Sequence, residues 1–348
     1  MEIATRFEAN PILRPANVPA SQEGLAVECV LNPGAFRYRG RTGLLLRVAE
    51  RATPRPGFVA TPVRDDEGAV EILEFADDES VDRSDPRAIR RGNDVYLTTL
   101  SHLRLAWSDN GVNFEVVDRP TIAGLGAVER YGVEDCRVTE IEGTFYLTYT
   151  EVSPDGYGVG LISTSNWSEF TRHGMILPPP NKDCALFPER IDGQYLALHR
   201  PSTVGLGGSF IWLARSPDLI HWGEHVCLLR TRPGMWDSAR VGAGASPIRT
   251  PHGWLEIYHG ANHENRYCLG GLLLDPNDPE KILARSTHPI MEPLADYEQT
   301  GFFGNVIFTN GHTLDGDELT VYYGAADEVM CGARFSITEI LQTLERAS

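Results

Sequence analysis

The chain has 348 residues, enough for one large domain or two ordinary ones, and its 42% hydrophobic and 23% charged residues are typical of globular proteins. Its 31 basic and 48 acidic residues give a formal charge of −17, which argues against nucleic acid or an anionic membrane as a partner. A locally basic pocket for a small anion remains compatible with this charge.

The six cysteines are widely scattered, and no two of them show C-x-x-C spacing. The sequence therefore predicts neither a zinc site nor a disulfide framework. The first residues, MEIATRFEANPILRP, lack a basic head followed by an apolar core, and no apolar run reaches membrane length. We therefore expect a reduced cytoplasmic protein that uses no metal and no resident cofactor.

One unit recurs roughly every 50 residues, a period typical of propellers, solenoids and arrays. It contains a short apolar stretch, a turn with Gly or Asn-Asp, a Tyr- or Leu-rich strand and a further strand. The six units begin near Asn32, Asp85, Glu134, Asp183, Gly242 and Gly304. Their alternation with period two excludes helical solenoids and favours a closed all-β ring.

We predict an all-β fold, a five-bladed β-propeller that forms a single domain over residues 1–348. Six units give five blades if the first and last units share one blade when the ring closes. The exception to the β pattern is SITEILQTLERAS at the C-terminus, which predicts a short helix with Ser336 or Thr338 as its cap.

The stretch YGVEDCRV carries two adjacent carboxylates, Glu134 and Asp135, close to Arg137. The residues that follow predict a hairpin with its turn at Glu142-Gly143. Because adjacent residues on a strand point to opposite faces, we expect the two carboxylates to have different surroundings. An arginine keeps a carboxylate ionised, whereas an apolar pocket raises its pKa and suits it to act as an acid. An ordinary ion pair at a strand end is the alternative interpretation.

Polar residues recur where the units begin, and the innermost strands of a propeller line its central channel. These residues are Asn32, Asp85, Asp135, Asp183 and Asn305. Polar side chains directed at one axis predict a sugar-binding site. Each of them singly also suits a turn-capping role, and at Asp85 the two interpretations are equally good.

Several separated motifs together resemble glycoside hydrolase family 130, the inverting mannoside phosphorylases and mannosidases. The resemblance runs from about Asn10 to Asp327, and it rests on NPGAFRYRG with LLLR, VEDCRV, NKDCALFPERIDGQYLALHRP, IYHG, GNVIFTNG and YYGAAD. Two positions depart from the family pattern: Cys136 replaces the usual proline, and Lys182 stands where several members carry arginine. The segments YLTTLSHLRLAWS and GFFGNVIF look more like the members that act on β-1,2-linked mannosides than like the β-1,4 branch.

The resemblance implies a five-bladed propeller that cleaves β-mannosides with inorganic phosphate as co-substrate and releases α-mannose 1-phosphate. It makes Asp135 the general acid, and it assigns phosphate binding to Lys182, Arg200 and His259 with Asn32 close by. Arg47 and Asp327 would hold the mannose whose bond is broken. The further substrate-binding residues that we expect are Glu134, Arg137, Asp183, Asn305, His102 and Arg104.

The chemistry of inversion is consistent with this division of roles. An inverting transfer needs an acid on the leaving oxygen and a nucleophile on the opposite face of the sugar. If phosphate is the nucleophile, the protein supplies cations instead of a second carboxylate base. The expected partners are thus a small mannoside and phosphate, and the sequence is also compatible with a homo-oligomer.

Two other functions remain open from the sequence. An inverting β-mannosidase would need a base for water at roughly 6.5–9.5 Å from the acid. The candidates for that base are Glu134, Asp183, Glu189 and Asp237. The second alternative is a non-catalytic propeller that binds glycans or proteins, which would not need an acid opposite a cationic pocket.

Overall fold

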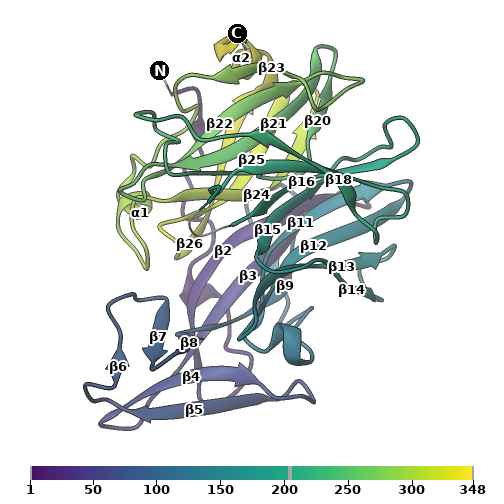
Figure 1. Cartoon of the computed structure of the whole chain (residues 1–348). Helices are drawn as coiled ribbons and strands as arrows, with labels where there is room; N and C mark the ends of the chain where they lie inside the picture. The colour runs from purple at the N-terminus through teal and green to yellow at the C-terminus, as the bar shows by residue number, and fades with distance from the viewer. Residues whose placement is uncertain (1, 203–205, 347–348) are drawn as a thin grey trace.

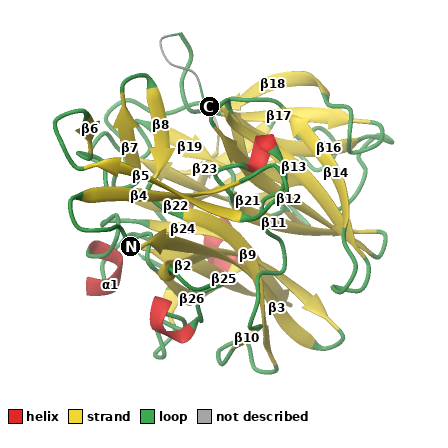
Figure 2. Ribbon diagram, turned by 90° about the horizontal axis from the view of Figure 1, so that it is seen from below, coloured by secondary structure: helices red, strands yellow, loops and turns green. Residues whose placement is uncertain are grey.

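The computed structural model describes residues 2–202 and 206–346, and strands make up most of its regular structure (Figures 1 and 2). Five sheets contain four or more strands, and each is named here after its first long or inner strand. The β2 sheet has the order β10 (Glu115–Val116), β9 (Leu100–Ser108), β3 (Arg41–Ala52), β2 (Leu25–Tyr38). The β11 sheet has the order β11 (Val133–Ile141), β12 (Thr144–Ser153), β13 (Gly156–Thr164), β14 (Thr171–Leu177).

The other three large sheets follow along the chain. The β15 sheet has the order β15 (Asn181–Leu186), β16 (Tyr195–Pro201), β17 (Ile211–Ser216), β18 (Gly223–Leu229). The β19 sheet has the order β19 (Arg240–Gly242), β21 (Gly253–Ala261), β22 (Tyr267–Leu274), β23 (Ile282–Ser286), β27 (Leu344–Arg346), with β20 (Ile248–Thr250) beside β21. The β24 sheet has the order β1 (Thr5–Arg6), β26 (Val329–Ser336), β25 (Glu318–Ala325), β24 (Ile307–Asp315).

Between β3 and β9 the chain leaves the β2 sheet and forms an excursion, which projects at the lower end of the molecule in Figure 1. It contains a hairpin of β4 (Phe58–Arg64) and β5 (Val70–Ala76), and a small sheet of β6 (Val81–Asp82), β7 (Ala88–Arg91) and β8 (Asp94–Leu97). The helical segments are α1 (Asp296–Gln299), α2 (Ile337–Thr343) and two 3-10 turns at Pro15–Asn17 and Ala127–Glu129. None of the helices in the described ranges is long and apolar enough to cross a membrane.

The core is divided among the spaces between the large sheets. Five buried apolar clusters each join side chains of two sheets, because both faces of most strands are covered. Each cluster can be illustrated by one residue from each of its two sheets: Leu44 with Tyr322, Leu45 with Leu147, Leu161 with Leu186, Leu198 with Tyr258, and Leu255 with Val321. These pairs connect the sheets in the order β24–β2–β11–β15–β19–β24, so each large sheet packs against two others.

The repeat that the sequence shows corresponds to the five sheets, but the expected sharing of a sheet is wrong. The units that begin near Asn32 and Asp85 share the β2 sheet, because β9 pairs with β3 after the excursion. The first and last units do not share a sheet. Only the two-residue β1 from the N-terminus joins the last sheet, antiparallel to β26.

The expected local structures around the hairpin and the C-terminal helix are confirmed. Strands β11 and β12 pair through a turn in which Glu142 and Gly143 both have positive φ, as a two-residue hairpin turn requires. At α2 the Ser336 side chain accepts a hydrogen bond from the Glu339 amide, so Ser336 is the N-cap. The helix is shorter than expected, because Leu344–Arg346 pair with β23 as an added strand.

Three inner strands carry a β-bulge around a left-handed Asx residue. The register shifts lie between Leu31 and Gly34, between Glu134 and Arg137, and between Lys182 and Ala185. Within them Asn32, Asp135 and Asp183 have φ of 43°, 49° and 54°. Asn and Asp tolerate this conformation best among residues with a side chain, and a bulge turns a side chain away from the regular alternation. Because of the bulges, these three polar side chains do not follow the regular alternation of the strands.

The corresponding bulge in β24 does not involve Asn305. Its register shift lies between Thr309 and Gly311, and the residue between them, Asn310, is buried and donates to the carbonyl oxygen of Asn32 at 3.2 Å. Asn305 is exposed and precedes the strand. Asn310, and not the Asn305 that the sequence analysis named, therefore occupies the bulge in this unit.

Gly132, immediately before β11, gives a stability prediction. It has φ of 97°, and a Cβ there would overlap the backbone oxygen of Ser101, which cannot move without shifting β9. We expect Gly132→Ala to lower the free energy of unfolding by about 1–3 kcal/mol more than the control Gly143→Ala. Gly143 has φ of 80° but open space around it. Equal losses, measured by denaturant unfolding, would contradict the close approach of these two strands.

Candidate active site

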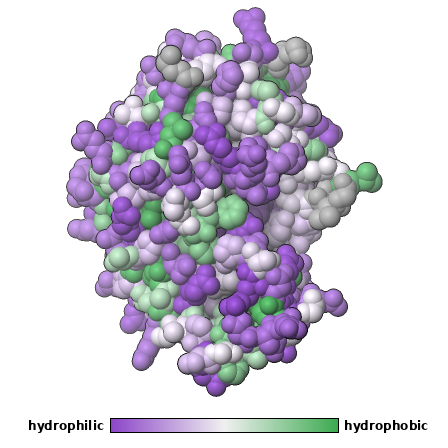
Figure 3. Space-filling model, turned by 90° about the vertical axis from the view of Figure 1, so that its left-hand side faces the viewer, coloured by the Kyte–Doolittle hydropathy of each residue, from purple (hydrophilic) through white to green (hydrophobic). Residues whose placement is uncertain are grey.

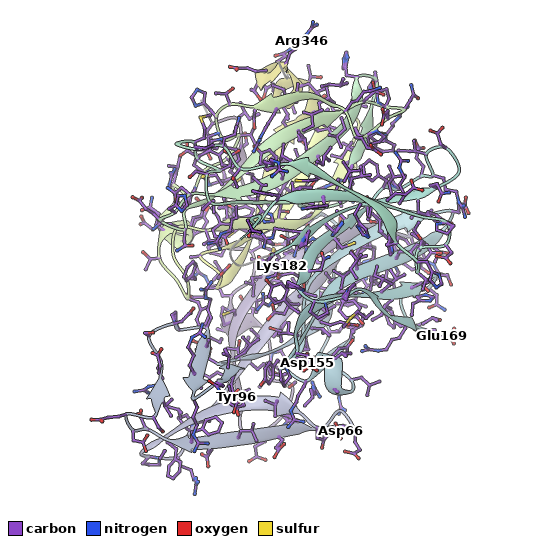
Figure 4. All side chains as sticks on the ribbon, viewed as in Figure 1. Asp66, Tyr96, Asp155, Glu169, Lys182 and Arg346 are labelled. Carbon is purple, nitrogen blue, oxygen red and sulfur yellow. The ribbon has the colours of Figure 1, made fainter. Side chains whose placement is uncertain are left out.

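A cavity of about 480 Å³ opens where the inner strands of the large sheets face the excursion. Its size lies within the ~300–1,000 Å³ range of small-molecule sites. Eight of the residues expected from the sequence line it: Asn32, Arg47, Glu134, Asp135, Lys182, Asp183, Arg200 and Asp327. Figure 4 shows one of them, Lys182, near the middle of the molecule, between the excursion and the upper sheets.

Asp135 lies in a strongly cationic environment. Its Oδ1 accepts hydrogen bonds from Asn32 Nδ2 at 2.9 Å and from Arg47 Nη1 at 3.1 Å. Burial by itself would raise the pKa of Asp135, but the charges of Arg47, Arg137 and Lys182 and the Asn32 hydrogen bond outweigh it. The pKa therefore lies below its ordinary value, and Asp135 is ionised in the unliganded protein.

The expectation that Glu134 and Asp135 have different surroundings is met only in part, because both contact Arg47 but only Asp135 also accepts from Asn32. Arg47 donates to both of them, from Nη2 to Glu134 Oε1 at 2.7 Å and from Nη1 to Asp135 Oδ1. The left-handed conformation of Asp135 breaks the strand alternation, so both carboxylates reach the same guanidinium. Arg47 is also fixed by Ser101, whose Oγ accepts from Arg47 Nε at 3.1 Å.

A second carboxylate, Asp183, connects two buried arginines. Arg137 Nη2 lies 3.0 Å from Asp183 Oδ1, and Arg200 Nε lies 3.1 Å from Asp183 Oδ2. Burial of Asp183 is opposed by the charges of Arg200 and Arg137, which hold its pKa well below the ordinary value. Arg137 also donates to the backbone oxygen of Asp135 at 2.9 Å. Arg137 does not line the cavity; it joins the strand of the acid to the strand of Asp183.

Lys182 differs from the arginines in having no carboxylate within 4 Å among the described residues. Its Nζ lies 4.9 Å from the centre of the Tyr157 ring, a cation–π contact. Its charge is nevertheless felt by Asp135, whose pKa it lowers. The Lys182 ammonium is thus available to an anion in the cavity.

His259 does not supply a charge to the cavity, contrary to the expectation. It is fully buried behind Arg200, with Nε2 at 3.3 Å from both Arg200 Nη1 and Asp183 Oδ2. Burial lowers its pKa to about 4 despite the opposing effect of Asp183. His259 is therefore neutral near pH 7, and its contacts position Arg200 and Asp183.

Three further expected residues lie outside the cavity. His102 and Arg104 project from the other face of β9, where His102 Nδ1 lies 3.5 Å from Glu50 and Arg104 donates to the Pro19 carbonyl at 2.7 Å. Both are buried, because the alternation of β9 gives the cavity side to Ser101. Asn305 is exposed and is not part of the lining. The structure does not bring these three side chains to the site.

Asp327 lies half-buried in the cavity wall with φ of 51°. Burial raises its pKa to about 6; Arg47 opposes this rise and the charge of Asp135 adds to it. Asp327 therefore gains a proton more readily than an ordinary carboxylate.

The residues around Asp135 form what we call the central charge cluster. It has four basic members, Arg47, Arg137, Lys182 and Arg200, and four acidic members, Glu134, Asp135, Asp183 and Asp327. With all eight ionised, its formal charge is zero. A dianion that enters the cavity therefore makes the cluster negative, and a proton taken up by one carboxylate reduces that negative charge.

Several cavity residues were missed by the sequence analysis. Tyr157, Tyr267, Arg87, Phe302 and Phe303 all line the cavity. Asp85, for which the sequence left a sugar-binding and a turn-capping role equally open, also lines the cavity, and its Oδ1 accepts from the Arg87 amide at 2.9 Å. Phe302 and Phe303 belong to the GFFGNVIF segment, but the sequence alone did not show that they would face the cavity together with residues of the excursion.

A buried carboxyl group behind the site was also missed. Glu256 Oε1 accepts from the Gly244 amide at 2.7 Å, and Gly244 in turn accepts from Arg137 Nε at 3.0 Å. Burial raises the pKa of Glu256 to about 8, so it is largely protonated near pH 7. It supports Arg137 without adding a charge to the cluster.

The carboxylates that a hydrolase would need are poorly placed. Asp237 is buried between Arg232 and Arg285 at 2.7 and 2.6 Å, and Glu189 is on the surface. Neither lines the cavity. The other two candidates, Glu134 and Asp183, are both held by arginines. Within residues 2–202 and 206–346, no group of three or more His, Cys, Asp or Glu side chains is arranged to hold a metal ion.

The chain is similar to known mannoside phosphorylases. The model of the family Glyco_hydro_130, described as beta-1,4-mannooligosaccharide phosphorylase, matches residues 94–346. The chain is 44% identical over 347 residues to a beta-1,2-mannobiose phosphorylase of Listeria innocua serovar 6a, covering 98% of both chains. It is 40% identical to a 1,2-beta-oligomannan phosphorylase of Thermoanaerobacter sp. (strain X514), covering 70% of this chain and 82% of that relative.

The structure is also similar to a solved one. The beta-1,2-mannobiose phosphorylase from Listeria innocua, determined in complex with beta-1,2-mannobiose, superposes with a TM-score of 0.95 at 43% identity and 99% coverage of both chains. Since the family model matches well over half of the chain and this relative is similar along nearly all of it, the chain belongs to glycoside hydrolase family 130.

Proposed function

We propose that this protein is an inverting phosphorylase that cleaves β-1,2-linked mannobiose or short oligomannosides with inorganic phosphate and releases α-mannose 1-phosphate. The observation that carries the proposal is one cavity with the Asp135 carboxyl group on β11 and the cations Lys182 and Arg200 on the neighbouring β15 sheet. The names of the relatives support the same activity and the β-1,2 linkage.

In this mechanism Asp135 delivers the proton that the leaving sugar oxygen needs, and phosphate attacks the anomeric carbon from the opposite face. Arg47 and Asp327 hold the mannose between them. Lys182 and Arg200 hold the phosphate, with Asn32 fixing Asp135 at 2.9 Å and His259 placing Arg200. A hydrolase has no use for an unpaired ammonium at the position of the nucleophile.

The lowered pKa of Asp135 in the empty site is compatible with its role as an acid. Arg47, Arg137 and Lys182 lower this pKa, and phosphate adds negative charge beside Lys182. Because the central charge cluster has no net charge, a bound dianion favours the protonated form of a nearby carboxyl group. Phosphate binding thus prepares the acid that its own reaction requires.

We further propose that the five large sheets are the blades of a five-bladed propeller and that residues 1–348 form one catalytic domain. The five apolar clusters support this arrangement, because they connect the sheets in an order that returns to its start. The pairing of β1 with β26 supports it as well, since it joins the two ends of the chain.

We infer that the enzyme needs no cofactor other than its co-substrate phosphate and works in the reducing cytoplasm. All six cysteines are unpaired, which suits a reducing compartment. Activity should survive dialysis against EDTA, because cations of the protein take the place of a metal at the phosphate. A loss of activity that a divalent metal restores would overturn the inference.

The role of Asp135 predicts a large loss in Asp135→Asn. The amide keeps the shape of the side chain but cannot donate the carboxyl proton, and general acids contribute ~10²–10⁴-fold to the rate. We expect a loss of at least that size in the rate of mannobiose phosphorolysis, in a protein that is folded and still binds mannose. The control is Asp155→Asn in the turn between β12 and β13. Near-full activity of Asp135→Asn would exclude Asp135 as the acid.

The phosphate site predicts a selective effect of Arg200→Ala. Charge-assisted hydrogen bonds are worth roughly 1.5–3 kcal/mol each, so phosphate affinity should fall on the order of 10–100-fold while mannose affinity changes much less. Initial rates at varied phosphate and varied mannobiose separate the two effects. Arg215→Ala is the matched control, because Arg215 on β17 pairs with Glu280 at 2.9 Å away from the cavity. A turnover rate that does not depend on phosphate in the unaltered enzyme would favour hydrolysis.

A further inference from the structure

We propose that Glu256 is a positioning residue that acts on the reaction through Arg137, and that it does so as a neutral carboxyl group. This inference rests on the proposed function, because it concerns how the acid and the phosphate-binding cations of that reaction are held in place. Glu256 lies on β21, behind the active site, and is not part of the cavity lining. Its influence therefore has to pass through other residues.

Glu256 and Arg137 bind opposite ends of one peptide group, the one between Ala243 and Gly244. Glu256 Oε1 accepts from the Gly244 amide at 2.7 Å, and the Ala243 carbonyl accepts from Arg137 Nη2 at 3.1 Å. The Gly244 carbonyl also accepts from Arg137 Nε at 3.0 Å. The carboxyl group therefore fixes the stretch of backbone to which two nitrogen atoms of the arginine are bound.

This stretch of backbone is packed closely against β21. A Cβ at Gly244 would overlap the backbone oxygen of Ile257, so no side chain fits at this position. Without a side chain, the segment depends on hydrogen bonds of its backbone for its position. Glu256, the residue before Ile257 on β21, supplies one of these bonds from the same strand.

Arg137 connects this backbone to the reacting groups. Its Nη1 donates to the backbone oxygen of Asp135 at 2.9 Å, and its Nη2 donates to Asp183 Oδ1 at 3.0 Å. Asp183 Oδ2 lies 3.1 Å from Nε of Arg200, one of the two cations proposed to bind phosphate. A displacement of Arg137 would therefore be felt both by the acid and by the phosphate site.

The surroundings of Glu256 favour its neutral form. Figure 3 shows a face of the molecule that is mostly hydrophilic, where water solvates ionised carboxylates. Glu256 is instead 0% exposed, and its Oε2 has no hydrogen-bond partner among the described residues. Burial raises the pKa of Glu256 to about 8, although the Gly244 amide and the charge of Arg137 oppose this rise. The carboxyl group is therefore neutral at pH 7 and ionises at mildly alkaline pH.

Ionisation of Glu256 would disturb the balance of charges behind the site. On β22 the residue opposite it is Leu272, the segment before β20 contributes the Gly244 amide, and β11 contributes Arg137, the charged group that acts on it. An ionised Glu256 would compete with Asp183 for the charge of this one arginine. It would also add a negative charge beside the central charge cluster, whose formal charge is zero, and so oppose the binding of phosphate.

The kinetic test compares two substitutions of Glu256 over a range of pH, with kcat/KM for phosphate as the measured quantity. Glu256→Gln keeps an acceptor oxygen but cannot ionise, so at pH 7 its kcat/KM should lie within about twofold of that of the unaltered enzyme. As the pH rises through about 8, the unaltered enzyme should lose activity and Glu256→Gln should not. Glu256→Leu removes the acceptor, and its kcat/KM at pH 7 should fall about 10-fold or more, because Arg137 is no longer held in place.

A second measurement reports the neutral state of Glu256 without using activity. An unfolded chain releases the proton of this residue at an ordinary glutamate pKa of about 4.3, whereas the folded protein keeps it up to about pH 8. The contribution of this group to stability is therefore lost as the pH rises between these values, and Glu256→Gln has no such loss. The Tm of Glu256→Gln minus that of the unaltered protein should become more positive from pH 5 to pH 8.

The matched control is Glu298→Gln. Glu298 is also 0% exposed, but its Oε1 accepts from Arg6 Nε at 2.7 Å and it does not line the cavity, so its substitution should leave the alkaline loss of activity in place. The same alkaline loss in Glu256→Gln, full activity of Glu256→Leu, or a Tm difference that does not change with pH would overturn the inference. If the unaltered enzyme forms no mannose 1-phosphate at pH 7, the proposed function itself fails, and the Tm measurement still decides the state of Glu256.

Discussion

The central charge cluster is the constraint on which the rest of the site depends. Buried ions are costly unless they are paired, and here Arg47, Arg137 and Arg200 each contact at least one carboxylate. The pairs fix the positions of Asp135 and Asp183, and they leave Lys182 as the one basic member of the cluster without a carboxylate partner among the described residues. A cluster that is neutral when empty responds to a bound dianion by protonation. In the proposed mechanism the same arrangement serves both anion binding and the supply of a proton.

The backbone makes this cluster possible. Asn32, Asp135 and Asp183 occupy left-handed positions at bulges in three inner strands, so their side chains leave the regular alternation and meet at the cavity. Strained backbone of this kind persists only where the surroundings hold it. Here the sheets are held by apolar clusters on both sides, and Arg137 ties β11 to Asp183 and to the Gly244 carbonyl. The packing of the sheets thus stabilises the unfavourable left-handed conformations of these three residues.

Sequence reasoning predicted the strands, the hairpin at Glu142-Gly143 and the Ser336 cap, because each follows from local pattern. It also identified eight cavity residues, because their motifs lie on inner strands or directly after a strand. It failed where the position or charge of a side chain depends on segments that are distant in the sequence. His102 and Arg104 lie on the wrong face of β9, and burial makes His259 neutral. Arg87 and Phe303 become partners only through the excursion. No local pattern reveals which face is covered or which loops meet.

The identity and anomeric form of the product distinguish inverting phosphorolysis from hydrolysis. The unaltered enzyme is incubated with β-1,2-mannobiose and inorganic phosphate, and the products are followed by phosphorus and proton NMR from the first turnovers. If phosphate is the nucleophile, we expect α-mannose 1-phosphate and one mannose per bond cleaved, with no cleavage when phosphate is omitted. Release of two mannose molecules at a rate that phosphate does not change, or formation of the β-anomer of mannose 1-phosphate, would contradict it.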